Sequence, residues 1–485
     1  MYRLILLVLF WIPSLLFTQN SAIQSAINTL DRDPDMRSAN WSFTVLDLSS
    51  GKTIASHDPY SSLSTASSLK AITTASALAI LGPNYRYETF IEHDGRLEGG
   101  ILEGNLYLRG SGDPSLGSDR FGEELAMDKV LNKWALKLKD SGIREIRGMI
   151  IGDAQAFSTQ LTPDEWAWED IGNYYGAGVS GLNLHENLYY LDLKPGPSVG
   201  SGTKVIRTRP AMNISFENEL RTAGSRTGDN AYIFGAPYTR IRYIRGTIPA
   251  GRSVFTIKGS IPDPTQFAAE RLKMALEKCG IIVEGGASSV RHERLQGRYR
   301  ESRRNVLLSH NSPRMSEIVY HTNMKSVNLF AEALARTIAV HNGKFGGNEE
   351  AVDEIMNYWS AKGIDTRGMN MRDGSGLSPG NAVSTYQMAS ILRYASRQSY
   401  FETFEKSLPL AGKSGSLRSM MKGTIAEGKV RAKSGYIAGV RSYTGYVRTR
   451  SGQHWAFSMI ANNYSCSAGA MRRKLEKLMV AMAGQ

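Results

Sequence analysis

The chain has 485 residues, of which 41% are hydrophobic and 21% are charged, and its formal net charge is +13. This composition excludes a largely disordered chain, and the length allows two or three hydrophobic cores. The positive charge favours anionic partners, but no zinc-finger or RRM signature accompanies it, so we predict no nucleic-acid partner.

Residues 1–19 have the pattern of a secretory signal peptide. The N-terminal region carries one charge, at Arg3, and is followed by the apolar run LILLVLFWIPSLLF. The sequence then turns polar at Thr18. A membrane anchor is the alternative, but about 14 apolar residues are fewer than the ~20 that span a bilayer. We therefore expect a secreted, soluble and periplasmic protein, whose charge allows peripheral association with a membrane or the cell wall.

Hydrophobic periodicity predicts a β-hairpin and a helix at the start of the mature chain. Residues 41–59 alternate around Ser49-Ser50-Gly51, which predicts the hairpin. Residues 67–81 have apolar positions at helical spacing and end at Gly82-Pro83, which predicts a buried helix.

The middle and the end of the chain differ in their sequence patterns. From about 90 to 290 the sequence has short β-like runs, many glycines and one clear helix at 265–279, which indicates inserted material. Residues 441–463 alternate around Ser451-Gly452 and predict a second hairpin, and 471–484 predict an amphipathic helix. The two ends of the chain thus supply elements of the same kind.

The sequence predicts neither a disulfide framework nor a metal site. Cys279 and Cys466 are too few for a scaffold, and two unpaired thiols are favoured over a single bridge. No HExxH motif or paired-cysteine spacing appears, so we predict no metal and no cofactor.

A Ser-x-x-Lys pattern can activate a serine, because residues i and i+3 share a helix face and a neutral amine can take the hydroxyl proton. The pattern occurs at Ser49/Lys52, Ser67/Lys70, Ser201/Lys204 and Ser419/Lys422. Only Ser67 begins a long apolar helix, whose N-terminus would favour a developing oxyanion. Taken alone, Ser67 could equally be a helix cap beside a surface lysine.

Two later motifs support the choice of Ser67. Ser-x-Asn can supply a relay hydroxyl and an amide. It occurs at 38–40, 309–311 and 326–328, and Ser326-Val327-Asn328 is preferred because it runs directly into the predicted helix LFAEALARTIAV. Lys-Ser-Gly on an edge strand can add positive charge and let a substrate lie alongside. It occurs at 413–415 and at 433–435, and only Lys433-Ser434-Gly435 leads into the C-terminal hairpin.

With these three motifs in this order, the sequence resembles the penicillin-recognising serine acyl-transferases. Ser67 and Ser326 are 259 residues apart, which is similar to the class C low-molecular-mass penicillin-binding proteins, the D-alanyl-D-alanine carboxypeptidase/endopeptidase family. Further blocks resemble that family: GNLYLRGSGDPSLG at 104–117, GMIIGDAQAF at 148–157, WAWEDIGNYYGAGVSGLN at 166–183, MRDGSGLS at 371–378 and GYIAGVRSYTGYV at 435–447.

The resemblance implies an α/β (α+β) fold: a penicillin-binding/β-lactamase-like transpeptidase domain with an antiparallel sheet flanked by helices, plus two smaller β-rich inserted domains. We expect the acyl-transferase domain at 20–90 and 293–485. Inserted domain II is expected at 91–185 and 260–292, and inserted domain III at 186–259.

The resemblance also implies a mechanism on peptidoglycan stem peptides. Ser67 would attack the carbonyl between two D-alanines, Lys70 would be the general base, and Ser326 would pass the proton to the leaving amine. Asn328 would hold the substrate amide and Lys433 would set the electrostatics. β-Lactams would acylate the same serine as substrate mimics.

The remaining implied roles concern the substrate's two ends. The terminal carboxylate would sit near Ser434 and Gly435, and the backbone N–H groups of Ser67 and Tyr436 would hold the oxyanion. Asp153 aligns with an acidic residue thought to bind the amine end of the stem peptide, although a loop aspartate without that role is nearly as well supported.

The sequence departs from the family pattern at two positions. Tyr436 stands where a threonine is usual, which removes a small hydroxyl from the carboxylate site, and Val327 replaces a common aspartate. Asp373 in MRDGSGLS is expected to shape a turn near the site.

Two other functions remain open at this point. A β-lactamase needs a group that activates water, and the only candidate noticed, Glu169 to Asn173, lies between the first and second motifs rather than after the second. A non-catalytic wall-binding protein on the same fold is expected to lose a catalytic residue, whereas all three motifs are intact.

Overall fold

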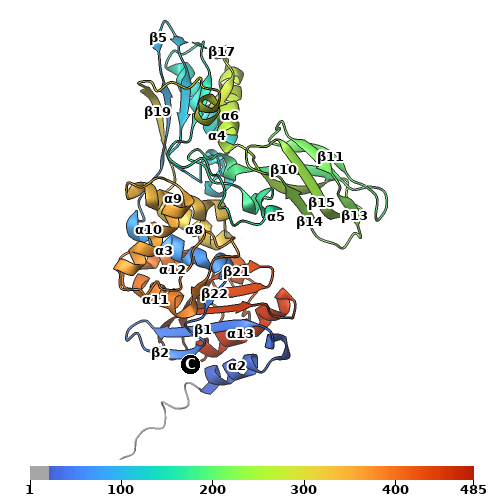
Figure 1. Ribbon diagram of the computed structural model, residues 1–485, viewed down its shortest axis with the longest axis vertical. Helices are drawn as coiled ribbons and strands as arrows, with labels where there is room; N and C mark the ends of the chain where they lie inside the picture. Colours follow the sequence, from blue (N-terminus) through green and yellow to red (C-terminus); the bar gives the residue numbers. More distant parts are fainter. Residues whose placement is uncertain (1–20) are drawn as a thin grey trace, which may run out of the picture.

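A computed structural model describes residues 21–485, so the predicted signal peptide at 1–19 lies outside the described residues. Figure 1 shows an elongated molecule with the predicted acyl-transferase domain at one end and the predicted inserted segments at the other. No helix among residues 21–485 is long and apolar enough to cross a membrane. Cys279 and Cys466 are both free thiols, as predicted.

The transferase domain is built on an antiparallel sheet that joins the two ends of the chain. Its strand order is β2-β1-β23-β22-β21. Trp41 pairs with Ala461 and Phe43 with Met459, so the N-terminal hairpin lies directly against the C-terminal one. The bounds are β1 Asn40–Asp47, β2 Thr53–His57, β21 Val430–Ile437, β22 Val440–Arg448 and β23 His454–Asn462. Both predicted hairpins are therefore confirmed.

Helices cover both faces of this sheet and bury its apolar side chains. α2 (Ser21–Asp31) and α13 (Ala468–Ala483) pack together on one face, where Phe43, Phe457 and Leu475 are buried in one cluster. The other face carries the larger helical layer: α3 (Lys70–Ile80), α8 (Met315–Lys325), α9 (Asn328–His341), α10 (Asn348–Ala361), α11 (Thr385–Ala395) and α12 (Phe401–Ser407). Two short strands, β3 (Ser62–Leu63) and β20 (Val383–Ser384), pair with each other as a separate small sheet beside this helical layer. Helix α3 is thus buried among the other helices of this layer.

The first inserted unit has two sheets packed against helices α4 (Met127–Asp140) and α6 (Pro264–Lys278). One sheet has the order β18-β9-β7-β4-β19 and the other β17-β8-β6-β5. The bounds are β4 Glu88–His93, β5 Arg96–Glu98, β6 Ile101–Glu103, β7 Leu106–Arg109, β8 Glu145–Ile146, β9 Ile150–Asp153, β17 Ile282–Val283, β18 Ala287–Ser289, α7 Val290–Leu295 and β19 Asn305–Asn311.

Two features of this unit differ from the sequence prediction. Helix α4 was not expected, although MDKVLNKWALKLKD places Val130, Leu131 and Trp134 in the core at helical spacing. Strand β19 lies in the segment predicted for the transferase domain, but it pairs with β4 in the inserted sheet. A local sequence pattern does not reveal a pairing between distant segments such as β4 and β19. The predicted bounds of the domains stay a prediction.

The second inserted unit is formed by two small sheets that project sideways in Figure 1. Their strand orders are β11-β10-β16 and β12-β15-β13, and β14 also pairs with β15. Short helix α5 (Trp168–Ile171) lies beside β14. The bounds are β10 Leu188–Lys194, β11 Lys204–Arg209, β12 Ser215–Asn218, β13 Arg221–Ala223, β14 Asn230–Phe234, β15 Ile241–Pro249 and β16 Phe255–Ser260. The predicted β-rich character of the inserts and the overall fold class are confirmed.

Candidate active site

Ser67 lies in a short 3-10 turn, Ala66–Leu69, that leads directly into α3. The backbone just before it is strained, because Ala66 has a φ of +44°. The loop at 373–378 packs against this turn: a Cβ atom on Gly376 would lie 2.0 Å from the Ala66 carbonyl oxygen. Packing therefore holds Ala66, directly before the half-buried Ser67, in a conformation that an isolated chain rarely adopts.

Lys70 is fully buried and its amine has three hydrogen-bond partners. Its Nζ lies 2.9 Å from Ser67 Oγ, 2.5 Å from Asn328 Oδ1 and 2.6 Å from the Ser375 carbonyl oxygen. Because α3 begins at Lys70 and Ser67 is three residues earlier, the two side chains meet on one face.

The partners of Lys70 determine where its protons go. The Ser375 carbonyl can only accept a hydrogen bond, and the same holds for Asn328 Oδ1. The orientation of the Asn328 amide is fixed in turn, because its Nδ2 donates to the Tyr175 carbonyl at 2.7 Å. A neutral amine has two N–H groups for these two acceptors, so its lone pair faces the Ser67 hydroxyl, the only partner that can donate.

Burial lowers the pKa of Lys70 to about 7, although the negative charges of Asp373 and Glu332 act in the opposite direction. Near neutral pH a large fraction of the amine is therefore unprotonated and able to act as a base. Lys433 is also fully buried, and burial together with the charge of Lys70 lowers its pKa well below the usual value.

Ser326 and Asn328 lie at the junction of two helices. Ser326 ends α8 in the left-handed conformation, with φ 58° and ψ 42°, and Asn328 is the first residue of α9. The predicted position at a rigid helix start is confirmed. The sharp junction aims Asn328 at Lys70 and Ser326 at Lys433, whose Nζ is 2.9 Å from Ser326 Oγ.

The Lys433-Ser434-Gly435 motif lies on β21, the edge strand of the sheet. Lys433 Nζ also donates to the Ser434 carbonyl at 2.8 Å. Gly435 lies so close to the turn that contains Ser67 that a Cβ atom there would be 2.4 Å from the Thr65 carbonyl oxygen. Ser442 on β22 joins the same contact, since its Oγ donates to that carbonyl at 2.5 Å. The edge strand and the turn that contains Ser67 are therefore packed closely together.

Asp373 organises the loop that contacts Lys70. Its carboxylate accepts hydrogen bonds from the backbone of Gly376 and Ser378, both at 2.6 Å, and from Trp166 Nε1 at 2.9 Å. Asn381 Nδ2 adds another at 2.9 Å. This arrangement agrees with the expected role of Asp373 in shaping a turn.

Glu332 is a buried acid that the sequence analysis did not identify. It lies one helical turn after Asn328 on α9, and its Oε2 accepts from the Gly374 backbone N–H at 3.1 Å. Its Oε1 is buried without a hydrogen-bond partner among the described residues. Burial, followed by the charge of Asp373, raises the pKa of this carboxyl.

The other occurrences of the motifs serve local structure. Ser49 lies in a hairpin turn, where its hydroxyl donates to Asp47. Ser414 Oγ accepts from the Leu410 backbone, and Lys413 forms an ion pair with Glu427. Ser309-His310-Asn311 belongs to strand β19 of the inserted sheet. Among the four Ser-x-x-Lys pairs, only Ser67 and Lys70 are joined by a hydrogen bond in the described part of the chain.

Tyr436 and Ser434 face the outside of the site. Tyr436 is 55% exposed, and Arg441 lies over its ring at 5.4 Å. Ser434 Oγ and Ser416 Oγ are 2.7 Å apart. Ser416 and Ser326 both line a cavity of about 510 Å³ that Lys325, Lys413 and Arg418 also line.

Asp153 is 1% exposed and already has a cationic partner. Arg304 Nη1 lies 2.6 Å from Asp153 Oδ2, and the Gln155 backbone N–H donates to Oδ1 at 3.0 Å. The residue lines a separate cavity of about 390 Å³ together with Glu92 and Arg109. Its role in binding an amine stays a prediction.

The Glu169–Asn173 segment serves the inserted unit. Asn173 Nδ2 donates to the Glu169 carbonyl at 2.6 Å, and Asn173 Oδ1 accepts from the Ile233 backbone at 3.1 Å. The asparagine thus ties α5 to β14. Because both ends of the Asn173 amide are engaged in these contacts, the segment is not arranged to position a hydrolytic water.

Some contacts of the site could not be assigned from sequence. The carbonyls of Tyr175 and Ser375 are main-chain groups that every residue has. Only their positions allow them to accept hydrogen bonds from Asn328 and Lys70. Both lie in blocks already singled out, 166–183 and 371–378. Glu332 had one signal, its spacing of four residues from Asn328 on one helix face.

Comparison with known proteins places this geometry in a family. The D-Ala-D-Ala carboxypeptidase 3 (S13) family model matches residues 23–484. A D-alanyl-D-alanine carboxypeptidase of Actinomadura sp. (strain R39) is 28% identical over 458 residues, covering 91% of this chain and 81% of the relative. The D-alanyl-D-alanine carboxypeptidase DacB of Haemophilus influenzae is 25% identical over 435 residues, covering 88% of this chain and 86% of the relative.

A solved structure shares the fold. The crystal structure of penicillin-binding protein 4 (dacB) from Haemophilus influenzae matches with a TM-score of 0.79 at 21% identity, covering 94% of this chain and 97% of that one. The resemblance to class C low-molecular-mass penicillin-binding proteins is therefore confirmed. Since the family model spans nearly all of the described residues, the chain belongs to the D-Ala-D-Ala carboxypeptidase 3 (S13) family of serine peptidases.

Proposed function

We propose that Ser67 is the nucleophile of a D-alanyl-D-alanine carboxypeptidase that acts on peptidoglycan stem peptides, with Lys70 as its general base. One observation carries this proposal: the amine of Lys70 has two partners that can only accept and one, Ser67, that can donate. A buried lysine with its pKa near 7 in this position is matched to proton abstraction from a serine.

In the proposed reaction, Lys70 takes the proton of Ser67 as Oγ attacks the carbonyl carbon between the two D-alanines. The negative charge that develops on the carbonyl oxygen is stabilised by the backbone N–H groups of Ser67 and Tyr436. When the C–N bond breaks, the leaving D-alanine amine takes the hydroxyl proton of Ser326, and the proton that Lys70 took from Ser67 replaces it. In the second half of the reaction, the hydroxyl of a water molecule adds to the carbonyl carbon of the Ser67 ester, and the proton of that water returns to Ser67 through Lys70, which restores the free enzyme.

The contacts of Ser326 support its role as a relay. Lys433 donates to Ser326 Oγ, so the hydroxyl hydrogen of Ser326 is free to point elsewhere in the cleft. Asn328 contributes its amide to Lys70 and to the inserted segment, and we propose that it also orients the substrate amide. Lys433 contributes positive charge beside the leaving group.

Release of D-alanine from a D-alanyl-D-alanine pentapeptide tests this proposal. We expect Ser67→Ala to abolish the release, while Ser419→Ala, at a second Ser-x-x-Lys pattern, leaves it unchanged. Unchanged release by Ser67→Ala would overturn the assignment. The β-lactamase alternative predicts fast turnover of penicillin, whereas we expect a long-lived acyl-enzyme.

A second activity, endopeptidase cleavage of crosslinks, is favoured by the cavity beside Ser326. If Ser326 protonates the leaving amine, this cavity of about 510 Å³ lies on the leaving-group side. Its size and the cations Lys325 and Arg418 suit a leaving group larger than D-alanine that carries a carboxylate. Product analysis on purified crosslinked muropeptides distinguishes the activities: cleaved dimers support the endopeptidase, and intact dimers beside released D-alanine exclude it.

We also propose that the protein is exported to the periplasm, where its substrate lies, with residues 1–19 removed as a signal peptide. β-Lactams are proposed as covalent inhibitors, which agrees with the β-lactam complex solved for the Haemophilus influenzae penicillin-binding protein 4. N-terminal sequencing of the secreted protein tests the export proposal, because retention of residues 1–19 would contradict it.

A further inference from the structure

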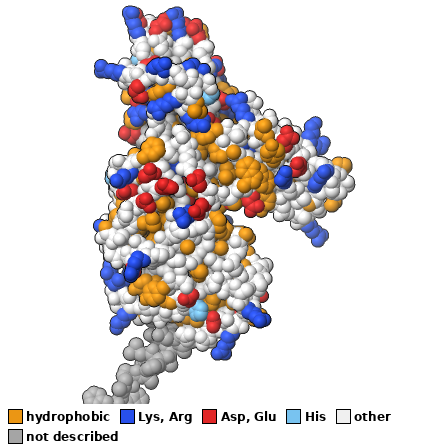
Figure 2. Space-filling view, in the orientation of Figure 1, with side chains coloured by type: hydrophobic (Ala, Val, Ile, Leu, Met, Phe, Trp, Pro, Cys, Tyr) orange, Lys and Arg blue, Asp and Glu red, His pale blue; other side chains and the backbone are white. Residues whose placement is uncertain are grey.

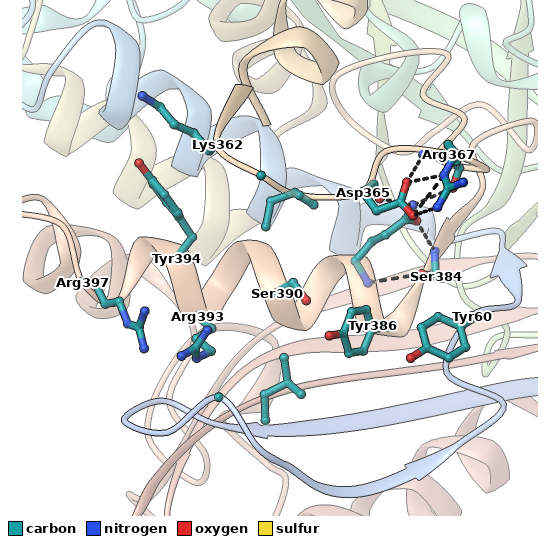
Figure 3. A pocket seen from close by; sticks show the side chains of 15 residues that line it. Tyr60, Lys362, Asp365, Arg367, Ser384, Tyr386, Ser390, Arg393, Tyr394 and Arg397 are labelled. Atoms are coloured by element: carbon teal, nitrogen blue, oxygen red, sulfur yellow. Dashed lines mark hydrogen bonds and ion pairs between the residues drawn. The ribbon is translucent and has the colours of Figure 1, made fainter. Parts of the chain in front are cut away.

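A large cavity opens on the transferase domain between the β1–β2 hairpin and α11, and it shares no lining residue with the catalytic motifs. Its volume is about 740 Å³, and its walls come from 46–60 and 362–397. We call it the α11 groove (Figure 3), defined by Gly51, the loop Lys362–Arg367 and the side chains of Tyr386, Ser390, Arg393 and Arg397.

The sequence of α11 explains why polar side chains line the groove. Ser390 and Arg393 follow Tyr386 by four and seven residues, so all three lie on one face of the helix. The opposite face, with Met388, Ile391 and Leu392, is buried in the core. Figure 3 shows the polar side chains in a row along the helix above the hairpin.

The groove carries more positive than negative charge. Its lining includes Lys362, Arg367, Arg393 and Arg397, but only one carboxylate, Asp365. Arg367 and Asp365 satisfy each other at 2.7 Å. The other three cations have no ion pair among the described residues, so an excess of three positive charges faces one cavity.

Arg393 is held in place without an acceptor for its buried N–H. Its guanidinium group lies over Gly51, where a Cβ atom would be 2.4 Å from Cζ. Its Nε is buried and has no hydrogen-bond partner among residues 21–485. Leaving a buried donor unpaired costs stability. Arg393 as a whole is only partly buried, and its two Nη atoms also have no hydrogen-bond partner among residues 21–485, so this outer part of the guanidinium group is free to bind an anionic ligand.

Neighbouring groups add fixed donors to the same cavity. Arg397 Nη2 donates to the Ser49 carbonyl at 3.1 Å, which anchors a second guanidinium group at the hairpin turn. Within the described chain, the hydroxyl groups of Tyr60, Tyr386 and Ser390 form no hydrogen bond with protein, and the two tyrosine rings lie 5.1 Å apart. Planar guanidinium groups and hydroxyls together match the oxygens of a phosphate group.

The positive charge of the molecule is not spread evenly over its surface. In Figure 2, acidic side chains gather at mid-height, while lysines and arginines surround the inserted unit and the lower part of the transferase domain. The acidic helix α10 carries Glu349, Glu350, Asp353 and Glu354. The α11 groove is thus a cationic site on a molecule that also has strongly acidic surface.

We propose that the α11 groove is a binding site for a phosphate group, carried either by an anionic lipid headgroup or by a soluble phosphate polymer. Arg393 and Arg397 supply the charge-assisted hydrogen bonds, and Lys362 and the free hydroxyls complete the site. Because the groove and the catalytic motifs have no residue in common, binding there leaves acylation of Ser67 unchanged. The site holds the enzyme close to phosphate-bearing surfaces or polymers of the envelope.

Two probes test the proposal on the purified protein: sodium polyphosphate in solution, and vesicles of phosphatidylcholine with or without phosphatidylglycerol. The test variant is Arg393→Gln/Arg397→Gln. Arg393 packs against Gly51, so replacing it also removes a packing contact. A second variant, Lys362→Gln/Arg397→Gln, therefore changes only exposed side chains. The control, Arg226→Gln/Arg303→Gln, removes the same charge from exposed positions in the inserted units. Labelling of Ser67 by a fluorescent penicillin reports folding of each protein.

We expect both groove variants to bind about tenfold or more weakly, and the control to bind like the unmodified chain. A difference confined to phosphatidylglycerol vesicles identifies the ligand as a lipid headgroup, whereas a difference with polyphosphate identifies a soluble polymer. Equal weakening in the control shows that net charge alone accounts for binding and overturns the proposal. Absence of binding by the unmodified chain to either probe overturns it too.

Discussion

Asn328 connects Lys70 to the inserted segment: its Oδ1 accepts from Lys70 Nζ at 2.5 Å, and its Nδ2 donates to the Tyr175 carbonyl at 2.7 Å. The amide therefore depends on having an acceptor on one side and a donor on the other. A carboxylate of the same shape cannot satisfy both contacts.

Asn328→Asp tests this relationship. The aspartate places a negative charge beside Lys70, which raises the pKa of the lysine, and it sets an acceptor against the Tyr175 carbonyl. We expect acylation by penicillin to slow about 100-fold at neutral pH and to recover partly at higher pH. Stopped-flow labelling across pH measures both effects. An unchanged rate would contradict the assigned amide orientation.

The pH dependence of acylation should report Lys70. Burial lowers its pKa to about 7, and only the neutral amine can accept the proton of Ser67. The second-order rate of penicillin labelling is therefore expected to rise as pH increases through about 7 and then to level off. A rate that does not change between about pH 5 and pH 9 would exclude Lys70 as the base.

Glu332→Gln should shift that profile. The negative charge of Glu332 favours protonated Lys70, so its removal lowers the pKa of the lysine and moves the acid limb to lower pH. The shift is expected to be smaller than that from a fully ionised carboxylate, because the pKa of Glu332 is itself raised to about 7. Glutamine can still accept from the Gly374 N–H, which preserves the local geometry. Glu349→Gln, an exposed acid on α10, is the matched control. If both variants keep the original profile, Glu332 acts on the loop alone and not on Lys70.

Gly435→Ala should separate the edge strand from the turn that contains Ser67. The added methyl would lie 2.2 Å from Ser442 Oγ and 2.4 Å from the Thr65 carbonyl oxygen. Such overpacking costs about 1–3 kcal/mol, so we expect a lower melting temperature and a slower acylation. Gly224→Ala, where the Cβ atom meets nothing within 4 Å, is the control. Equal melting temperatures and rates for the two variants would show that the strand can move away.

Much of the catalytic geometry could be predicted because each motif lies next to a distinctive element. Ser67 precedes a long apolar helix, Asn328 begins α9, and Lys433 lies on the strand of a clear hairpin. Both hairpins are local in sequence, so their alternation was sufficient to predict them.

The parts that sequence missed depend on contacts between distant segments. The Tyr175 and Ser375 carbonyls reach the site only through the path of the chain, and no residue type marks such groups. Strand β19 pairs with β4 more than two hundred residues earlier. Helix α4 has apolar residues at helical spacing, but the glycine-rich, β-like sequence around it favours strands.

The central claim, that Ser67 forms the acyl-enzyme with Lys70 as base, is tested most directly by mass spectrometry of the penicillin-treated protein after digestion. We predict one adduct, on the peptide that contains Ser67, which is absent in Ser67→Ala and strongly reduced in Lys70→Ala. An adduct that persists in Ser67→Ala, or that maps to Ser326 or Ser419, would contradict the account.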